Sequence, residues 1–237
     1  MPPADVILAV EDLDVHYGGS RILRNLSLQI GRGSIAAIMG RNGVGKTTLL
    51  KAMVGLLTPT KGKVFFAGGE ITTEATDSRA RLGLGYVPQG REIFPRLSVL
   101  ENLQAGLQAR QDGLRQVPEE IYELFPVLAQ MADRMGGNLS GGQQQQLAIA
   151  RALVGDPDVL ILDEPTEGIQ PSIILEIERV LLKLKDGGRF TIVLVEQYFD
   201  FARQIADHFF LMDRGEILLQ GGAGELSDES IKSHLTF

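Results

Sequence analysis

The residues best suited to chemistry form a glycine-rich run at positions 40–47, which fits the pattern G-x-x-x-x-G-K-[ST]. Its glycines allow backbone conformations that other residues avoid, so that N–H groups can surround phosphate oxygens. We expect Lys46 to carry positive charge to the β and γ phosphates, and Thr47 to offer its hydroxyl to Mg²⁺. The run therefore predicts a nucleotide phosphate site. The predicted contacts are Gly40, Arg41, Asn42, Gly43, Val44, Gly45, Lys46, Thr47 and Thr48.

Two adjacent carboxylates, Asp163 and Glu164, follow the apolar run at positions 159–162. Such a pair is costly at the end of a buried strand unless a cation or another partner compensates its charge. We therefore predict that Asp163 orients the coordination shell of Mg²⁺ and that Glu164 polarises the attacking water. A helix cap at the end of the strand is the alternative, but Pro165 and Thr166 favour a fixed turn.

A third motif, Leu-Ser-Gly-Gly-Gln at positions 139–143, precedes a predicted helix at 143–154. Ser140 is a favourable N-cap, and Gly141 and Gly142 let an anion approach the start of the helix. By itself the motif indicates only a helix cap. The glutamines at positions 144–146 are interpreted as a polar helix face.

The elements that must position these motifs are strands, because each of three predicted strands ends where a motif begins. The strand at 35–39 leads into the glycine-rich run, the strand at 159–162 into the carboxylate pair, and the strand at 191–195 into Glu196 and Gln197. Open parallel sheets bind ligands outside the carboxyl ends of their strands. We therefore expect the motifs to converge on one edge of a sheet.

Two kinds of pattern divide the chain. Short predicted strands (8–10, 14–17, 22–30 and 63–66) and a helix at 47–57 come first, and a helix at 172–185 and a hairpin of strands 209–212 and 216–219 come last. Between them, residues from about 92 to 156 show helical patterns at 99–109, 118–132 and 143–154. This arrangement predicts an α/β fold with an inserted helical lobe.

Composition limits the function classes. The net charge of −7 argues mildly against a nucleic-acid partner, which usually requires a basic surface. The absence of cysteine excludes disulfides and thiolate metal sites. No apolar run approaches the roughly 20 residues that span a bilayer, and no secretory signal opens the sequence. We expect a cytoplasmic protein whose role at a membrane, if it has one, depends on a partner.

Taken together, the three motifs resemble those of the ATP-binding cassette (ABC) ATPases. The resemblance covers nearly the whole chain and implies one domain over residues 1–237. Residues 1–90 and 157–237 would form the core, with a mixed or parallel central sheet and an N-terminal antiparallel β subdomain, and residues 91–156 a helical subdomain. It implies ATP and Mg²⁺ as cofactors and a second ATPase subunit paired head to tail. The signature residues Ser140, Gly141, Gly142 and Gln143 would then close over the γ-phosphate held by the partner.

The resemblance assigns further residues one by one. Tyr17 matches the aromatic residue that stacks on adenine, and Gln89 matches the glutamine that touches Mg²⁺ and links the site to the helical lobe. Two positions depart from the family: Gln170 replaces an aspartate, and Gln197 replaces a histidine. Gln197 can hydrogen-bond the γ-phosphate but cannot titrate near neutrality. Hydrolysis led by Glu164, with Lys46 and Gln197 in support, remains the expected chemistry.

Segments 88–102 and 195–197 resemble the ATPase subunits of urea or short-chain amide importers and of branched-chain amino acid importers, and segment 165–174 is more similar to the urea branch. The resemblance implies transmembrane permease partners, an extracytoplasmic solute-binding protein acting indirectly, and a peripheral location at the cytoplasmic face of the membrane. We predict that residues 91–97 dock the permease. The rival class, a soluble ABC ATPase of DNA repair, chromosome structure or translation, usually has a coiled coil, zinc motifs or two cassettes, which this sequence lacks.

Overall fold

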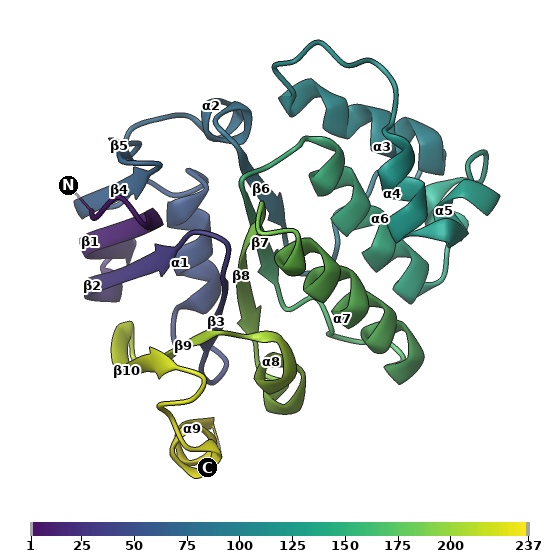
Figure 1. Ribbon diagram of the computed structural model, residues 1–237. Helices are drawn as coiled ribbons and strands as arrows, with labels where there is room; N and C mark the ends of the chain where they lie inside the picture. The colour runs from purple at the N-terminus through teal and green to yellow at the C-terminus, as the bar shows by residue number, and fades with distance from the viewer. Residues whose placement is uncertain (1, 236–237) are drawn as a thin grey trace.

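The computed structural model describes residues 2–235, and an antiparallel four-stranded sheet forms its N-terminal part (Figure 1). Its strands, in the spatial order β2-β1-β4-β5, are β1 (Val6–Tyr17), β2 (Ser20–Gly31), β4 (Lys61–Phe66) and β5 (Gly69–Glu70). The two short strands predicted within residues 8–17 are one strand. Its pairing with β2 shifts register between Val10 and Leu13, where Asp12 has a φ of 49°. This local irregularity interrupts the alternation and accounts for the apparent break.

A six-stranded sheet forms the centre of the molecule, in the order β10-β9-β3-β8-β7-β6. Its strands are β3 (Ile35–Met39), β6 (Leu84–Val87), β7 (Val159–Asp163), β8 (Thr191–Glu196), β9 (His208–Asp213) and β10 (Glu216–Gly222). The pairs among β6, β7, β8, β3 and β9 are parallel, and β9 pairs with β10 antiparallel. The predicted mixed central sheet is confirmed. The interior residues of β3, β7 and β8 are apolar because both faces of the sheet are covered.

Two cores lie on the two faces of the central sheet. On one face, α1 (Lys46–Met53) packs between the central sheet and the antiparallel sheet (Figure 1). On the other, α6 (Gly141–Val154), α7 (Pro171–Asp186) and α8 (Phe199–Ile205) cover the strands. Alternate residues of β3 enter opposite cores: Ala36 and Ile38 face α1, while Ile35, Ala37 and Met39 face the other side. This alternation fixes where the ends of the strands point.

The segment between β6 and β7 is helical, as predicted. It contains α3 (Val99–Gly106), η1 (Leu107–Ala109), α4 (Glu119–Leu124), α5 (Pro126–Gln130), η2 (Gly136–Asn138) and α6, which Figure 1 shows gathered on one side of the central sheet. The single helix expected at 118–132 is wrong. Pro126 begins a new helix, because a proline has no backbone N–H and clashes with the preceding turn.

The sequence did not predict the helices α2 (Thr76–Arg81), α8 and α9 (Asp228–Leu235), nor the strands β5 and β6. The α2 helix is fixed by Arg79, which is 1% exposed and donates hydrogen bonds to the carbonyl oxygens of Ala52, Met53, Thr72 and Glu74. Within residues 2–235, no helix combines the length and apolarity needed to cross a bilayer. The predicted boundaries of the core and helical subdomains remain predictions.

Candidate nucleotide site

The glycine-rich run forms the turn between β3 and α1. The backbone at Gly43 has a φ of 80°, a region that side chains rarely allow. A Cβ at Gly40 would lie 2.4 Å from the Met212 carbonyl oxygen, so only glycine fits there. The first helical residue is Lys46, so the N-terminus of α1, with its partial positive charge, points at the turn. This geometry suits phosphate.

Lys46 is held inside the turn. Its side chain is 4% exposed, and its Nζ donates to the carbonyl oxygens of Gly40 at 2.8 Å and Arg41 at 3.0 Å. The Nζ also lies 3.7 Å from Oε1 of Glu164. Burial lowers the pKa of Lys46, and the nearby carboxylates of Glu164 and Asp163 oppose that shift. The ammonium is therefore oriented by backbone carbonyl oxygens and lies next to the Glu164 carboxylate.

Asp163 and Thr47 provide oxygen atoms suited to a hard cation. The Thr47 hydroxyl lies 3.4 Å from Oδ1 of Asp163, while Oδ2 of Asp163 is buried without a hydrogen-bond partner. Burial raises the pKa of Asp163 to about 6, and the Thr47 hydrogen bond opposes the shift. No cluster of three His, Asp or Glu side chains that could hold a metal occurs among residues 2–235. Mg²⁺ commonly takes one or two protein ligands and completes its shell with phosphates and water, so these two residues fit it.

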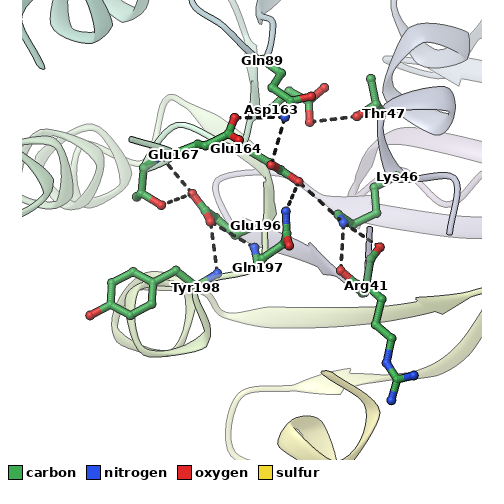
Figure 2. Close-up of polar contacts among 12 residues, drawn as sticks. Arg41, Lys46, Thr47, Gln89, Asp163, Glu164, Glu167, Glu196, Gln197 and Tyr198 are labelled. Carbon is green, nitrogen blue, oxygen red and sulfur yellow. Dashed lines mark hydrogen bonds and ion pairs between the residues drawn. The ribbon is translucent and has the colours of Figure 1, made fainter. Parts of the chain in front are cut away.

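Glu164 lies at the centre of the polar network in Figure 2. Gln197 Nε2 donates to its Oε1 at 2.7 Å, and Gln89 Nε2 donates to its Oε2 at 3.2 Å. Its backbone N–H donates to the Val195 carbonyl oxygen at 2.9 Å, and its φ is 49°, in the left-handed region. Neighbouring strands β7 and β8 thus bring the acid and Gln197 together. With Lys46, these contacts fix both carboxylate oxygens.

Gln89 contacts two carboxylates. Besides Glu164, it donates to Oε2 of Glu167 at 3.0 Å. It follows β6 and precedes three consecutive residues with positive φ, Gly90, Arg91 and Glu92. This loop continues into the helical segment, so the backbone connects the Gln89 amide, which contacts the Glu164 carboxylate, to that segment.

The signature motif lies elsewhere. The Ser140 Oγ accepts from the Gln143 N–H at 3.3 Å and the Gln143 Oε1 accepts from the Ser140 N–H at 3.0 Å, which forms a capping box at the start of α6. A Cβ at Gly142 would lie 2.8 Å from Cγ1 of Ile173, so α6 approaches α7 closely there. The motif lines a hollow with Gly168 and Gln170.

The structure therefore divides the predicted site residues into two groups. One pocket is lined by Asn42, Gly43, Gly45, Lys46, Thr47, Thr48, Gln89 and Glu164, with Ile22 added from β2. The signature residues do not line it. Tyr17, at the end of β1, is 47% exposed and does not line it either. Stacking of adenine on Tyr17 stays a prediction, as do the individual roles of the other residues.

Two participants, Glu196 and Glu167, were assigned no role from the sequence. Glu196 lies at the end of β8 with its carboxyl buried among backbone N–H groups, and Glu167 binds Gln89. Glu196 carried the same signal as Asp163, an acid after an apolar run. The polar-face interpretation of the glutamines was wrong for Gln145 and Gln146, which are 4% and 3% exposed. Gln146 donates to Glu176 of α7 at 2.6 Å, because α6 is covered by α7 on that side.

Comparison with known proteins identifies the family. The ABC transporter family model matches residues 23–167. The probable branched-chain amino acid transport ATP-binding protein LivF of Archaeoglobus fulgidus is 39% identical, over 93% of this chain and 94% of that protein. The lipopolysaccharide export system ATP-binding protein LptB of Escherichia coli K12 is 33% identical, over 95% of each chain.

A solved dimeric structure of a bacterial ABC transporter cassette has the same fold. It superposes with a TM-score of 0.83 at 26% identity, over 92% of this chain and 99% of that chain. The pocket lined by Lys46, Thr47 and Glu164 agrees with this assignment, and Asp163 lies beside it, 3.4 Å from the Thr47 hydroxyl. The chain belongs to the ABC transporter family, as an ATP-binding subunit that hydrolyses ATP.

Proposed function

We propose that the chain drives import of urea or short-chain amides through partner permease subunits at the cytoplasmic face of a membrane. The segment at 165–174 carries this assignment. Its residues contact functional ones: Thr166 donates to Glu196, Glu167 accepts from Gln89, and Ile173 packs on Gly142. The resemblance to urea importers therefore falls on a segment that joins the catalytic acid to the signature.

Import of branched-chain amino acids is the second candidate, which the 39% identity to LivF supports. An ATPase subunit does not touch the solute, so uptake by cells must decide between the two. Cells lacking this chain should lose uptake of labelled urea and keep uptake of labelled leucine, and the intact gene should restore it. The Glu164→Gln variant is the matched control: it should keep the fold, lose turnover and therefore not restore uptake. Loss of leucine uptake alone would select the second candidate, and loss of neither would reject import.

We assign the hydrolytic roles from the contacts around Glu164. Thr47 and Asp163 would hold Mg²⁺, which supplies charge stabilisation at the phosphate oxygens when bound. Lys46 would contact the γ-phosphate from the floor of the turn. Glu164, aligned by Gln89 and Gln197, would orient and polarise the attacking water. Gln197 has no titrating ring, so it acts only by donating and accepting hydrogen bonds.

A head-to-tail dimer would complete the nucleotide site. The pocket around Lys46 contains no signature residue, and the signature faces its own hollow. The fold matches a cassette solved as a dimer. In a twofold dimer, every contact between the two subunits occurs twice, so two equivalent nucleotide sites would form. The signature of one subunit would therefore cover the phosphate pocket of the other, whether the second subunit is identical or related.

We place permease docking at a groove of about 360 Å³ between the central sheet and the helical segment, lined by residues that include Tyr86, Phe94, Ala105, Gly106 and Arg151. Phe94 belongs to the predicted stretch 91–97 and is 47% exposed. The Arg151 guanidinium lies 4.9 Å from the centre of the Phe94 ring, and its Nη1 is buried without a hydrogen-bond partner. The groove therefore suits an apolar helix that carries an acidic side chain.

Co-purification from membranes tests this docking. Phe94→Ser and Arg151→Gln should lose the permease subunits, because the first removes apolar contact and the second removes the charge. Leu218→Ser is the matched control, since Leu218 is also exposed, at 52%, but lies on β10. Retention of permease by both groove variants would place docking elsewhere.

A further inference from the structure

Glu196, the last residue of β8, has a buried carboxylate that no assigned role explains. It is 2% exposed, and no cationic side chain pairs with it among the ion pairs of residues 2–235. Burying a charge in this way is expensive unless hydrogen bonds compensate it. Its surroundings supply them, from two loops that both reach Glu164.

Both carboxylate oxygens of Glu196 accept hydrogen bonds, one set from each loop. Oε1 accepts from the backbone N–H of Thr166 at 3.1 Å and from its hydroxyl at 2.7 Å. Oε2 accepts from the backbone N–H groups of Gln197 at 3.1 Å and Tyr198 at 3.3 Å, as Figure 2 shows. One side chain thus joins the turn after Glu164 to the loop that carries Gln197.

We propose that Glu196 is a positioning residue for hydrolysis, which aligns the Gln197 amide with the catalytic acid. Gln197 Nε2 donates to Oε1 of Glu164 at 2.7 Å. The backbone N–H of Glu164 donates to the carbonyl oxygen of Val195, the residue before Glu196 in β8. Releasing the backbone of Gln197 would let its side chain leave Glu164. Releasing Thr166 would loosen the turn in which Glu164 holds its left-handed φ of 49°.

The chemistry of the side chain explains why an acid is needed. An ionised carboxylate has two acceptor oxygens and no donor, so it can satisfy all four donors. A glutamine in the same place keeps one acceptor oxygen and turns an NH₂ group toward the N–H donors of the other loop. Glu196→Gln therefore preserves volume and removes one of the two attachments.

The test compares Glu196→Gln with Thr191→Val at the opposite end of the same strand. Thr191 is 1% exposed and its hydroxyl accepts from the Gly33 N–H at 2.9 Å, so its loss is a buried-polar change far from Glu164. In the full chain with MgATP, Glu196→Gln should lower kcat by about tenfold to a hundredfold, as misalignment near the reacting atoms does. The KM for ATP should stay within about twofold, because Lys46 and the phosphate turn are unchanged.

Both variants should lower the melting temperature, and Thr191→Val should keep its kcat. A purely structural role for Glu196 predicts lost stability with unchanged kcat, and that result would overturn the proposal. If Glu196→Gln does not fold, Thr166→Val removes the shortest of the four bonds and should lower kcat in the same direction.

A double variant identifies the route of the effect. If Glu196 acts through Gln197, Glu196→Gln should cost less kcat in a Gln197→Ala background than in the wild type, because coupled residues are not additive. The same fold-loss in both backgrounds would contradict the assignment. Binding of a non-hydrolysable ATP analogue should be equal in the wild type and in Glu196→Gln, because Lys46 and the phosphate turn are unchanged.

Discussion

We propose that two regions meet phosphate: the phosphate edge, which is Lys46, Thr47, Asp163 and Glu164, and the signature at residues 140–143. Their surroundings differ. At the phosphate edge, Lys46, Asp163 and Glu164 are buried. Hydrogen bonds from two loops, through Gln89 and Gln197, and an ion pair with Lys46 hold the Glu164 carboxylate. At the signature, Ser140 and Gln143 cap their own helix and Ser140 is exposed. One region fixes reacting groups, while the other keeps a helix start accessible.

This difference explains how one chain can hold two unlike half-sites. Burial at the phosphate edge excludes water and strengthens charge interactions there. The signature needs only a rigid, glycine-lined N-terminus that a second molecule's nucleotide can approach. Substitutions in the two regions should therefore have different effects. The quantities to compare are the ATPase rate, its dependence on a partner subunit, the pH dependence of stability, and the unfolding free energy.

The largest effect is expected at Glu164. Glu164→Gln keeps the contacts of one oxygen but removes the basic carboxylate, so kcat should fall by about 10²- to 10⁴-fold. ATP binding should persist, because Lys46 and Thr47 are intact, and ATP-bound dimers should accumulate. Phosphate release and size-exclusion chromatography with ATP measure the two properties. Near-normal turnover would remove Glu164 from the catalytic role.

A mixing experiment separates the two half-sites. Lys46→Ala disables the phosphate edge, and Ser140→Arg blocks the signature with a bulky cation. Each should be inactive alone if the chain forms homodimers. A 1:1 mixture would form mixed dimers with one intact composite site, so it should regain roughly a quarter of the wild-type ATPase rate. A mixture as inactive as its components would argue against a head-to-tail arrangement of identical chains.

The sequence predicted strands reliably where an apolar run ends in a motif, and it predicted the other strands less well. Strands β3, β7 and β8 are continuous apolar runs buried on both faces, so their ends located the site. Strand β6 was missed because Leu-Gly-Tyr-Val is short and carries a glycine, although it pairs with β7 over its whole length. Its pairing partner β7, which is remote in the sequence, and core packing of Leu84 and Val87 stabilise it.

The sequence identified the site residues that belong to short continuous motifs. The glycine-rich turn is one such motif, and Asp163 and Glu164 form another. The roles of Glu196 and Glu167 depend on loops that are far apart in sequence, such as 166 and 196–198, meeting at the sheet edge. Likewise, the burial of Gln145 follows from the packing around α6, which periodicity alone does not show.

The phosphate edge should also differ from the signature in how pH affects stability. Burial raises the pKa of Asp163 from 3.8 to about 6. The folded state then keeps a proton that the unfolded state loses. The associated stabilisation is present below about pH 4 and is lost as the pH rises through about 6, by up to roughly 3 kcal/mol. In EDTA and without nucleotide, Asp163→Asn should flatten this part of the stability-versus-pH curve in urea unfolding. An unchanged slope would assign the pH dependence to other groups.

The smallest effect compares two matching helix caps. Ser140 on α6 and Ser98 on α3 each form a capping box, with Gln143 and Glu101 respectively. Replacing either serine by alanine should cost about 1 kcal/mol of unfolding free energy. If Ser140 serves only its helix, Ser140→Ala and Ser98→Ala should also have equal ATPase rates. We expect instead that Ser140→Ala alone lowers turnover, because its hydroxyl would meet the partner's γ-phosphate. Equal turnover in the two variants, at equal loss of stability, would show that Ser140 only caps its helix. Gly141 and Gly142 would then be the residues left to contact the partner's nucleotide.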